Sequence, residues 1–140
     1  MIKEIIRDKE FLSQKPEPGT AEDAQVAQDL VDTIMANQED CACLAANQIG
    51  YCKAIAAFKL DDEDPQVMFN PRIKAAMKPY KAFENCLSLD EGSNVTRFDD
   101  IKVVFEELVD GQLVARQKRY TDWTAEIVQH CIDHCHGRLV

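Results

Sequence analysis

Two histidines near the end of the chain, His130 and His134, are four residues apart. Residues four apart on a helix lie one above the other, so both imidazoles can reach one metal ion. Many helices carry such a pair without binding metal, and a third ligand is needed to give the pattern weight. Cys86, in the segment from Glu84 to Ser88, is a candidate for that ligand. Two histidines, one cysteine and an open fourth position are typical of a catalytic rather than a structural metal site.

The element that must position the histidine pair is a helix. We expect it to begin near Thr121 or Asp122 and to carry both histidines on one face. It should end at about His136, because Gly137 is a typical residue just beyond the last helical turn.

Patterns in the rest of the chain predict an α+β domain. Apolar residues at helical spacing predict a further helix over residues 21–36, with Thr20 as its N-cap. The clearest strand pair, 101–109 and 112–119, flanks Asp110-Gly111, a turn type in which both residues need a positive φ. Further strands are expected over residues 53–59, 66–69 and 73–77. The order is helix, antiparallel strands, helix, and the absence of alternating βαβ units argues against a parallel sheet.

Composition and charge exclude several classes of protein. A chain of 140 residues is long enough for one domain, residues 1–140, and too short for two of ordinary size. The net charge of −9 argues against a nucleic-acid surface, which needs clustered lysine and arginine. No apolar stretch approaches the roughly 18 residues that span a bilayer, and the N-terminus mixes charges into every turn. We therefore expect a cytoplasmic protein with no signal peptide or membrane anchor.

The six cysteines are unusual in their placement. Without a secretion signal they predict reduced thiols rather than a disulfide framework. Five of them fall in the segments with candidate chemistry, namely Cys41, Cys43, Cys86, Cys131 and Cys135. Free cysteines are commonly small core residues, so a structural role and a chemical role both stay open at this point.

Three segments follow one another along the chain in a specific order. They read CACLAANQIG at residues 41–50, ENCLS at 84–88 and QHCIDHCHG at 129–137. The chain thereby resembles the peptide deformylases, whose motifs are written GxGLAAxQxG, EGCLS and QHExDHxxG. Phe69-Asn70-Pro71 and Arg97 are also similar to family positions between the motifs. The likeness covers nearly the whole chain, and it implies antiparallel strands packed around the C-terminal helix, with a further N-terminal helix.

The resemblance implies a site for one divalent ion, iron or zinc, held by Cys86, His130 and His134. The side chain of Gln48 and the backbone N–H of Leu87 would donate hydrogen bonds to the formyl oxygen, forming an oxyanion hole. The ion would polarise the formyl group and acidify a water molecule. The family's reaction is the hydrolytic removal of the formyl group from the N-terminal formylmethionine of nascent peptides, so the implied partner is a peptide N-terminus at the ribosome.

Cys131 departs from the family, which has at this position the glutamate that carries the proton from water to the leaving amine. A thiol side chain is shorter than that of glutamate, and its ordinary pKa is near 8.5. General acid–base catalysis typically contributes a factor on the order of 10² to 10⁴ in rate. The change therefore predicts weak or absent deformylase activity.

Two roles of Cys131 stay open. It can fill the vacated space as a small apolar residue, or it can join Cys43 and Cys86 in a soft thiol cluster. Direct ligation of the ion by Cys131 is not expected, because the residue after His130 is rotated by about 100° around the helix.

The substrate groove that the resemblance implies includes two further departures. The glycines of the family's first motif are replaced by Cys41 and Cys43. Since glycine permits positive φ or close approach of a substrate, Cys43 is expected to narrow the groove. We expect Cys43 and Leu44 to line it. Trp123 and Ile127 are most simply core residues, and the resemblance also places them at the pocket for the methionine side chain.

Three functions follow as hypotheses. The first is a metal hydrolase that removes N-formyl groups, and the second is a relative without activity that binds a peptide N-terminus or a partner. The third is a thiol or metal sensor on the same fold, favoured only by the excess of cysteines. Because the chain ends at Val140, soon after its third motif, we expect a minimal and monomeric version of the fold.

Overall fold

The computed structural model describes residues 1–39, 41–60, 63–86, 88–89 and 91–140. Its helices are α1 (Lys9–Leu12), α2 (Ala24–Ala36) and α3 (Asp122–Cys135), with 3-10 turns η1 (Ala21–Asp23) and η2 (Ala46–Ile49). Its strands are β1 (Cys43–Ala45), β2 (Ile55–Phe58), β3 (Gln66–Glu84), β4 (Ser93–Val109) and β5 (Gln112–Thr121).

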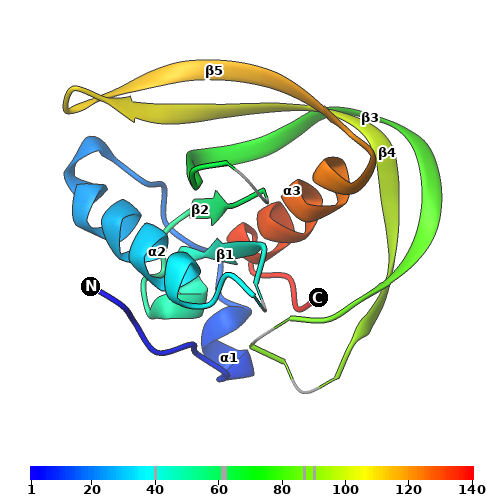
Figure 1. Ribbon diagram of the computed structural model, residues 1–140, viewed down its shortest axis with the longest axis horizontal. Helices are drawn as coiled ribbons and strands as arrows, with labels where there is room; N and C mark the ends of the chain where they lie inside the picture. Colours follow the sequence, from blue (N-terminus) through cyan, green and yellow to red (C-terminus); the bar gives the residue numbers. More distant parts are fainter. Residues whose placement is uncertain (40, 61–62, 87, 90) are drawn as a thin grey trace.

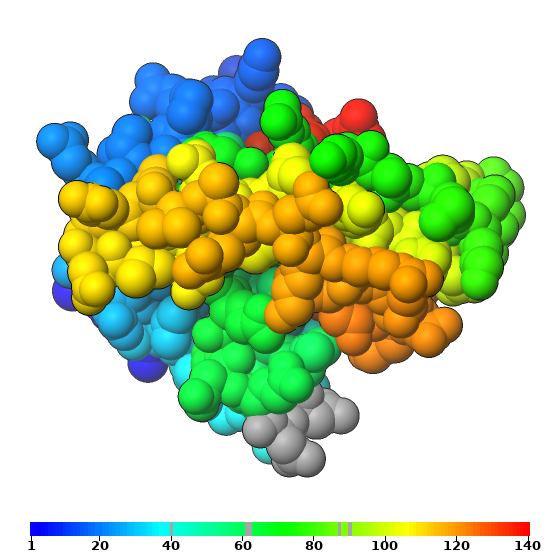
Figure 2. Space-filling view, turned by 90° about the horizontal axis from the view of Figure 1, so that it is seen from above, coloured from blue at the N-terminus to red at the C-terminus, as the bar shows by residue number. Residues whose placement is uncertain are grey.

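The strands form one antiparallel sheet in the order β1-β2-β3-β4-β5. The long strands β3 and β4 curve around α3, and β5 extends the sheet above it (Figure 1). Seen from above, the hairpin of β4 and β5 forms a yellow and orange band across the molecule (Figure 2). The expected α+β architecture, with antiparallel strands around the C-terminal helix, is confirmed.

The predicted hairpin is present and longer than expected. Asp110 and Gly111 have φ of 49° and 78°, as a tight turn with two positive φ values requires. The two strands expected over 66–69 and 73–77 are one strand, β3. Asn70, with φ of 53°, lies before Pro71, and here the pairing with β4 shifts register without ending the strand.

The short strands β1 and β2 lie between α2 and α3 (Figure 1). Because alternate side chains of a strand point to opposite faces, each strand contributes to two cores. Leu44, Ile55 and Ala57 pack in the cluster that contains the apolar face of α2. Ala45 and Ala56 pack on the other face, against α3. As a result, α3 is buried along most of its length. Among the described residues, no helix is long and apolar enough to cross a membrane.

Both expected helices are confirmed, with their ends. Thr20 accepts a hydrogen bond from the backbone N–H of Glu22 at 3.2 Å, and the Asp23 carboxylate accepts one from the Thr20 N–H at 2.8 Å. This capping box begins η1 and α2. At the end of α3, Gly137 has φ of 76°, and a Cβ added there would lie 2.6 Å from the carbonyl oxygen of Gln14.

Replacing Gly137 should therefore destabilise the fold more than replacing another glycine of positive φ. We expect Gly137→Ala to cost at least about 2 to 3 kcal/mol, because left-handed strain of about 1 to 2 kcal/mol adds to a backbone clash. Gly50→Ala is the matched control, since Gly50 has φ of 95° and no atom within 4 Å of the added Cβ. Urea unfolding of both variants measures the difference, and equal losses would contradict the role of the contact with Gln14.

Candidate functional site

The three candidate metal ligands come together. The sulfur of Cys86 and one ring nitrogen each of His130 and His134 all lie within 4.8 Å of one another. Cys86 follows the end of β3, and the two histidines lie one turn apart on α3, with ring centroids 4.9 Å apart. The fold thus brings two segments that are distant in sequence to one point.

The two histidines have the free nitrogens that a metal ligand needs. His134 is 0 % exposed, and neither of its ring nitrogens has a hydrogen-bond partner. A buried imidazole without partners is costly, and a bound ion would remove that cost. The Nδ1 of His130 lies 2.8 Å from a carboxylate oxygen of Glu84. Since an ionised carboxylate only accepts, Nδ1 carries the hydrogen and Nε2 is left for an ion. The donor set therefore fits a divalent metal.

Cys86 is held as a thiolate. Burial raises the pKa of Cys86, but the neighbouring imidazoles of His130 and His134 outweigh this effect and lower the pKa to about 5. Burial lowers the pKa of His130, but its hydrogen bonds with Cys86 and Glu84 raise the pKa to about 10. Cys86 and His130 thus form a thiolate–imidazolium pair, whose proton a divalent ion would replace.

Gln48 lies against the same sulfur. Its side-chain amide donates to the Cys86 sulfur at 3.0 Å and to the Ser88 hydroxyl at 3.1 Å. Its carbonyl oxygen accepts from the backbone N–H of Ala45 at 2.9 Å, so the amide group is fixed with its donors towards the ligands. Leu87, the other expected donor, lies outside the described residues, and its role stays a prediction.

A pocket of about 360 Å³ adjoins the candidate ligands. It is lined by Cys41, Ala42, Cys43, Gln48, Phe83, Glu84, Asn85, Cys86, Trp123, Glu126, Ile127 and His130. Cys43, Trp123 and Ile127 are among these lining residues, and their role in binding a substrate stays a prediction. Ile127 is 5 % exposed, and Trp123 is 63 % exposed. A larger hollow of about 760 Å³ lies between α2 and the β4–β5 hairpin and contains none of the candidate site residues.

Three comparisons with known proteins agree on a family. The model of the polypeptide deformylase family matches residues 2–140. The chain belongs to the peptide deformylase family. It is 39% identical to a peptide deformylase of Clostridium beijerinckii over the full length of both chains. A peptide deformylase structure from Legionella pneumophila is 25% identical, with a TM-score of 0.83 over 99% of this chain and 83% of that one. A class I type b peptide deformylase from Acinetobacter baumannii bound to Met-Ala-Ser, 23% identical, shares the fold with a TM-score of 0.85 over 99% and 97%.

Cys131, at the position of the deformylase glutamate, is buried, with 0 % exposure, and is not among the described residues that line the pocket. Its thiol points to the carbonyl oxygen of Ala57 at 3.5 Å and shares a hydrogen bond with the Cys43 thiol. That bond lowers the pKa of Cys131, but burial and the nearby Cys135 outweigh it and raise the pKa. The same bond, with burial, raises the pKa of Cys43.

Two residues of the deformylase first motif, Cys43 and Leu44, have side chains on opposite faces of β1. Cys43 lies in β1 and is not among the residues of positive φ, so its side chain affects the site by the space it fills. The side chain of Leu44 is fully buried in the α2 core and does not line the pocket, because alternation in β1 directs it to the opposite face from Cys43.

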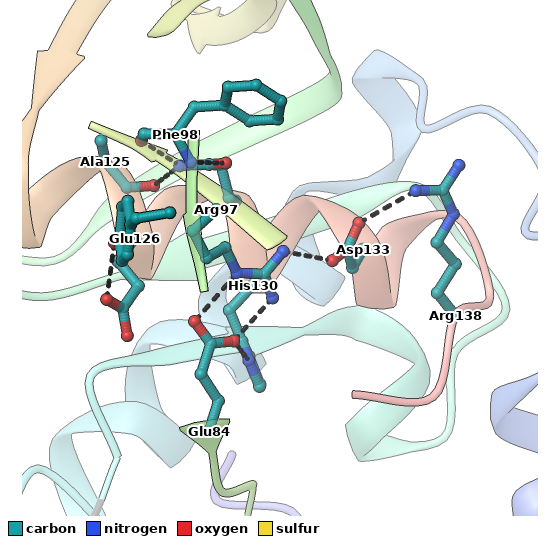
Figure 3. A network of polar contacts seen from close by, with 10 residues as sticks. Glu84, Arg97, Phe98, Ala125, Glu126, His130, Asp133 and Arg138 are labelled. Atoms are coloured by element: carbon teal, nitrogen blue, oxygen red, sulfur yellow. Dashed lines mark hydrogen bonds and ion pairs between the residues drawn. The ribbon is translucent and has the colours of Figure 1, made fainter. Parts of the chain in front are cut away.

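A buried ion-pair network behind His130 was not assigned a role from the sequence (Figure 3). Arg97 donates two hydrogen bonds to Glu84, at 2.9 and 2.6 Å, and one to Asp133 at 2.6 Å. Burial raises the pKa of Glu84, but bonds from Arg97 and His130 outweigh this effect and lower the pKa to about 2. Glu84 and Asp133 stand at the acidic positions of the second and third motifs. This match was the sequence signal that could have indicated the network. The network fixes the orientation of the His130 ring.

Proposed function

We propose that this chain binds a divalent ion, iron or zinc, at Cys86, His130 and His134 and accepts the N-terminus of a formylated peptide in the adjoining pocket. We propose further that it removes the formyl group slowly. Peptide binding is supported by the Acinetobacter baumannii relative, which is bound to Met-Ala-Ser.

We propose a slow rate because of the position of Cys131. Its buried thiol faces Ala57 and Cys43, and its pKa is raised. A thiol in this state neither takes a proton from water at neutral pH nor passes one to a leaving amine. Without the usual proton carrier, a factor on the order of 10² to 10⁴ in rate is expected to be missing.

The other residues that the reaction would need support the proposal. An ion bound at the site would supply a Lewis acid that polarises the formyl carbonyl and lowers the pKa of water. The amide of Gln48, fixed by Ala45, would donate a hydrogen bond to the formyl oxygen as negative charge develops there. The backbone N–H of Leu87 would be the second donor. We assign the loss of rate to the missing proton carrier.

A second candidate function is peptide binding without turnover. It is favoured by the same observation, because the candidate ligands and the pocket lie together while the residue at the position of the proton carrier is replaced. A thiol sensor is less favoured. The pKa values of Cys43, Cys131 and Cys135 are all raised, and a buried protonated thiol is a poor nucleophile.

The ligand assignment is tested by His134→Ala, with His136→Ala as control. His136 is exposed just beyond α3 and lies outside the ligand group. With protein purified without oxygen, we expect one ion per chain in the native protein and in His136→Ala. His134→Ala should lose the ion, because two ligands remain.

Turnover of a formyl-Met-Ala-Ser peptide by the same samples tests the activity. Slow turnover that disappears with the ion supports the proposal, and peptide binding without turnover supports the second candidate. If the native chain matches relatives that carry the glutamate, the role given to Cys131 is wrong. Retention of the ion by His134→Ala would contradict the ligand set.

A further inference from the structure

Glu126 places a carboxyl group in an otherwise mostly apolar part of the pocket. It lies on α3 one turn before His130, and both residues line the pocket. The walls around it include Phe83, Trp123 and Ile127. A pocket with such walls suits an apolar side chain, and a carboxyl group in it calls for a partner.

The charges around Glu126 leave it without a cation. Glu84, the other acid of the pocket, is already bound by Arg97 and His130. Glu126 accepts a hydrogen bond from the Tyr80 hydroxyl at 2.7 Å, and none of the described lysines or arginines forms an ion pair with it. Among the described residues that line the pocket there is no lysine or arginine. In Figure 3 the Glu126 carboxyl stands apart from the guanidinium of Arg97.

The pKa of Glu126 agrees with the lack of a paired cation. Burial, with a hydrogen bond to Glu84 and the charge of that residue, raises the pKa of Glu126 despite the hydrogen bond from Tyr80 and the charge of Arg97, which forms no ion pair with it. An uncompensated carboxylate in a partly buried place has such a shift, and a cation beside it would reverse the shift.

Resting on the proposed function, we infer that Glu126 is a specificity-determining residue, which makes the pocket prefer peptides whose first side chain has an apolar stem and a cationic end. Residues one turn apart on a helix are separated by about 5.4 Å along its axis. A first residue whose formyl group lies at the ligands beside His130 can therefore extend a long unbranched side chain along α3 as far as Glu126. The stem would lie against Ile127 and Trp123, and the ammonium or guanidinium group would pair with the carboxylate.

Trp123 is the only tryptophan of the chain, so its fluorescence reports directly on the pocket. The probes are formyl-Lys-Ala-Ser, formyl-norleucine-Ala-Ser and formyl-Met-Ala-Ser, added to the metal-loaded protein. Norleucine has the stem of lysine without its ammonium group. We expect the lysine peptide to bind about ten-fold or more tightly than the norleucine peptide, as for a charge-assisted hydrogen bond in a partly desolvated site.

Glu126→Gln keeps the shape and removes the charge, and it should abolish the preference for lysine while the norleucine peptide binds as before. Glu22→Gln, which removes an exposed charge on η1, should keep the preference. Tyr80→Phe, which leaves the Glu126 carboxylate in place, should also keep the preference for the lysine peptide.

The outcomes separate this inference from the proposed function. If the methionine and norleucine peptides bind as tightly as the lysine peptide, or if Glu126→Gln keeps the preference, only the role of Glu126 is overturned. If Glu126→Gln loses turnover of all three peptides with unchanged binding, Glu126 acts in the chemistry and the inference is overturned. If no peptide changes the fluorescence or is turned over, the proposed function fails together with it.

Discussion

The double variant Cys43→Gly/Cys131→Glu should hydrolyse a formyl-Met peptide about 100-fold faster than the native chain, or more. A glutamate on α3 at position 131 restores a carboxylate that can carry the proton from water to the leaving amine, a role worth a factor on the order of 10² to 10⁴. The second change is needed because the Cys43 thiol contacts Cys131 and lines the pocket, whereas Cys131 does not. Steady-state turnover at saturating metal measures the gain.

The single variants should gain little. Cys131→Glu alone puts a carboxylate into a fully buried place among Ala45, Ala56 and Cys135, which destabilises the fold unless the group finds a partner. Cys43→Gly alone opens space without supplying a base. We therefore expect the gain of the double variant to exceed the product of the two single effects, as for residues in contact.

Cys43→Gly/Cys131→Gln is the matched control, because glutamine has the shape of glutamate and cannot carry the proton. It should bind peptide like the glutamate variant and stay as slow as the native chain. An equal gain in both double variants would show that steric relief explains the rate. No gain in the glutamate variant, with the ion bound, would place the obstacle elsewhere in the groove, at Cys41 or Asn85.

Local patterns were enough to predict α3, the Asp110-Gly111 turn and the shared helix face of His130 and His134. Helical spacing puts His130 and His134 on one face wherever the helix lies, and a turn of two positive φ values depends on its own residues. The long β3 could not be predicted, because Asn70 and Pro71 suggest an end to a strand. Only pairing with β4 carries the strand through the register shift.

The sequence left open which contacts the residues of β1 make. The contact between Cys43 and Cys131 joins β1 to α3, and whether Leu44 faces the groove or the core depends on which side of β1 meets α2. The role of Glu126 was missed for the same reason. A single acid on a helix is usually solvated, and it becomes notable only once β3 brings Tyr80 and Phe83 around it.

Arg97→Ala should destabilise the chain by an amount on the order of 3 to 5 kcal/mol. The guanidinium is buried between Glu84 and Asp133, and its removal takes the buried cation from both carboxylates. Glu84 would keep only His130, and Asp133 would keep only the exposed Arg138. That loss is a large part of the 5 to 15 kcal/mol typical of a folded domain. Since Glu84 also orients His130, affinity for the ion should fall by a factor of about 10 to 100. Urea unfolding with a chelator present measures stability apart from metal binding.

Arg116→Ala is the control for losing an arginine from an ion pair. Arg116 pairs with Glu107 at 3.1 Å on the surface of β4 and β5, where both side chains are exposed. Its loss should cost less than about 1 kcal/mol and leave metal affinity unchanged. The loss of stability in Arg97→Lys should lie between those of Arg97→Ala and Arg116→Ala. Lysine keeps the charge but cannot reproduce the paired hydrogen bonds to Glu84. If Arg97→Ala is no more damaging than Arg116→Ala, the network does not support the site, and the orientation of His130 must come from packing within α3.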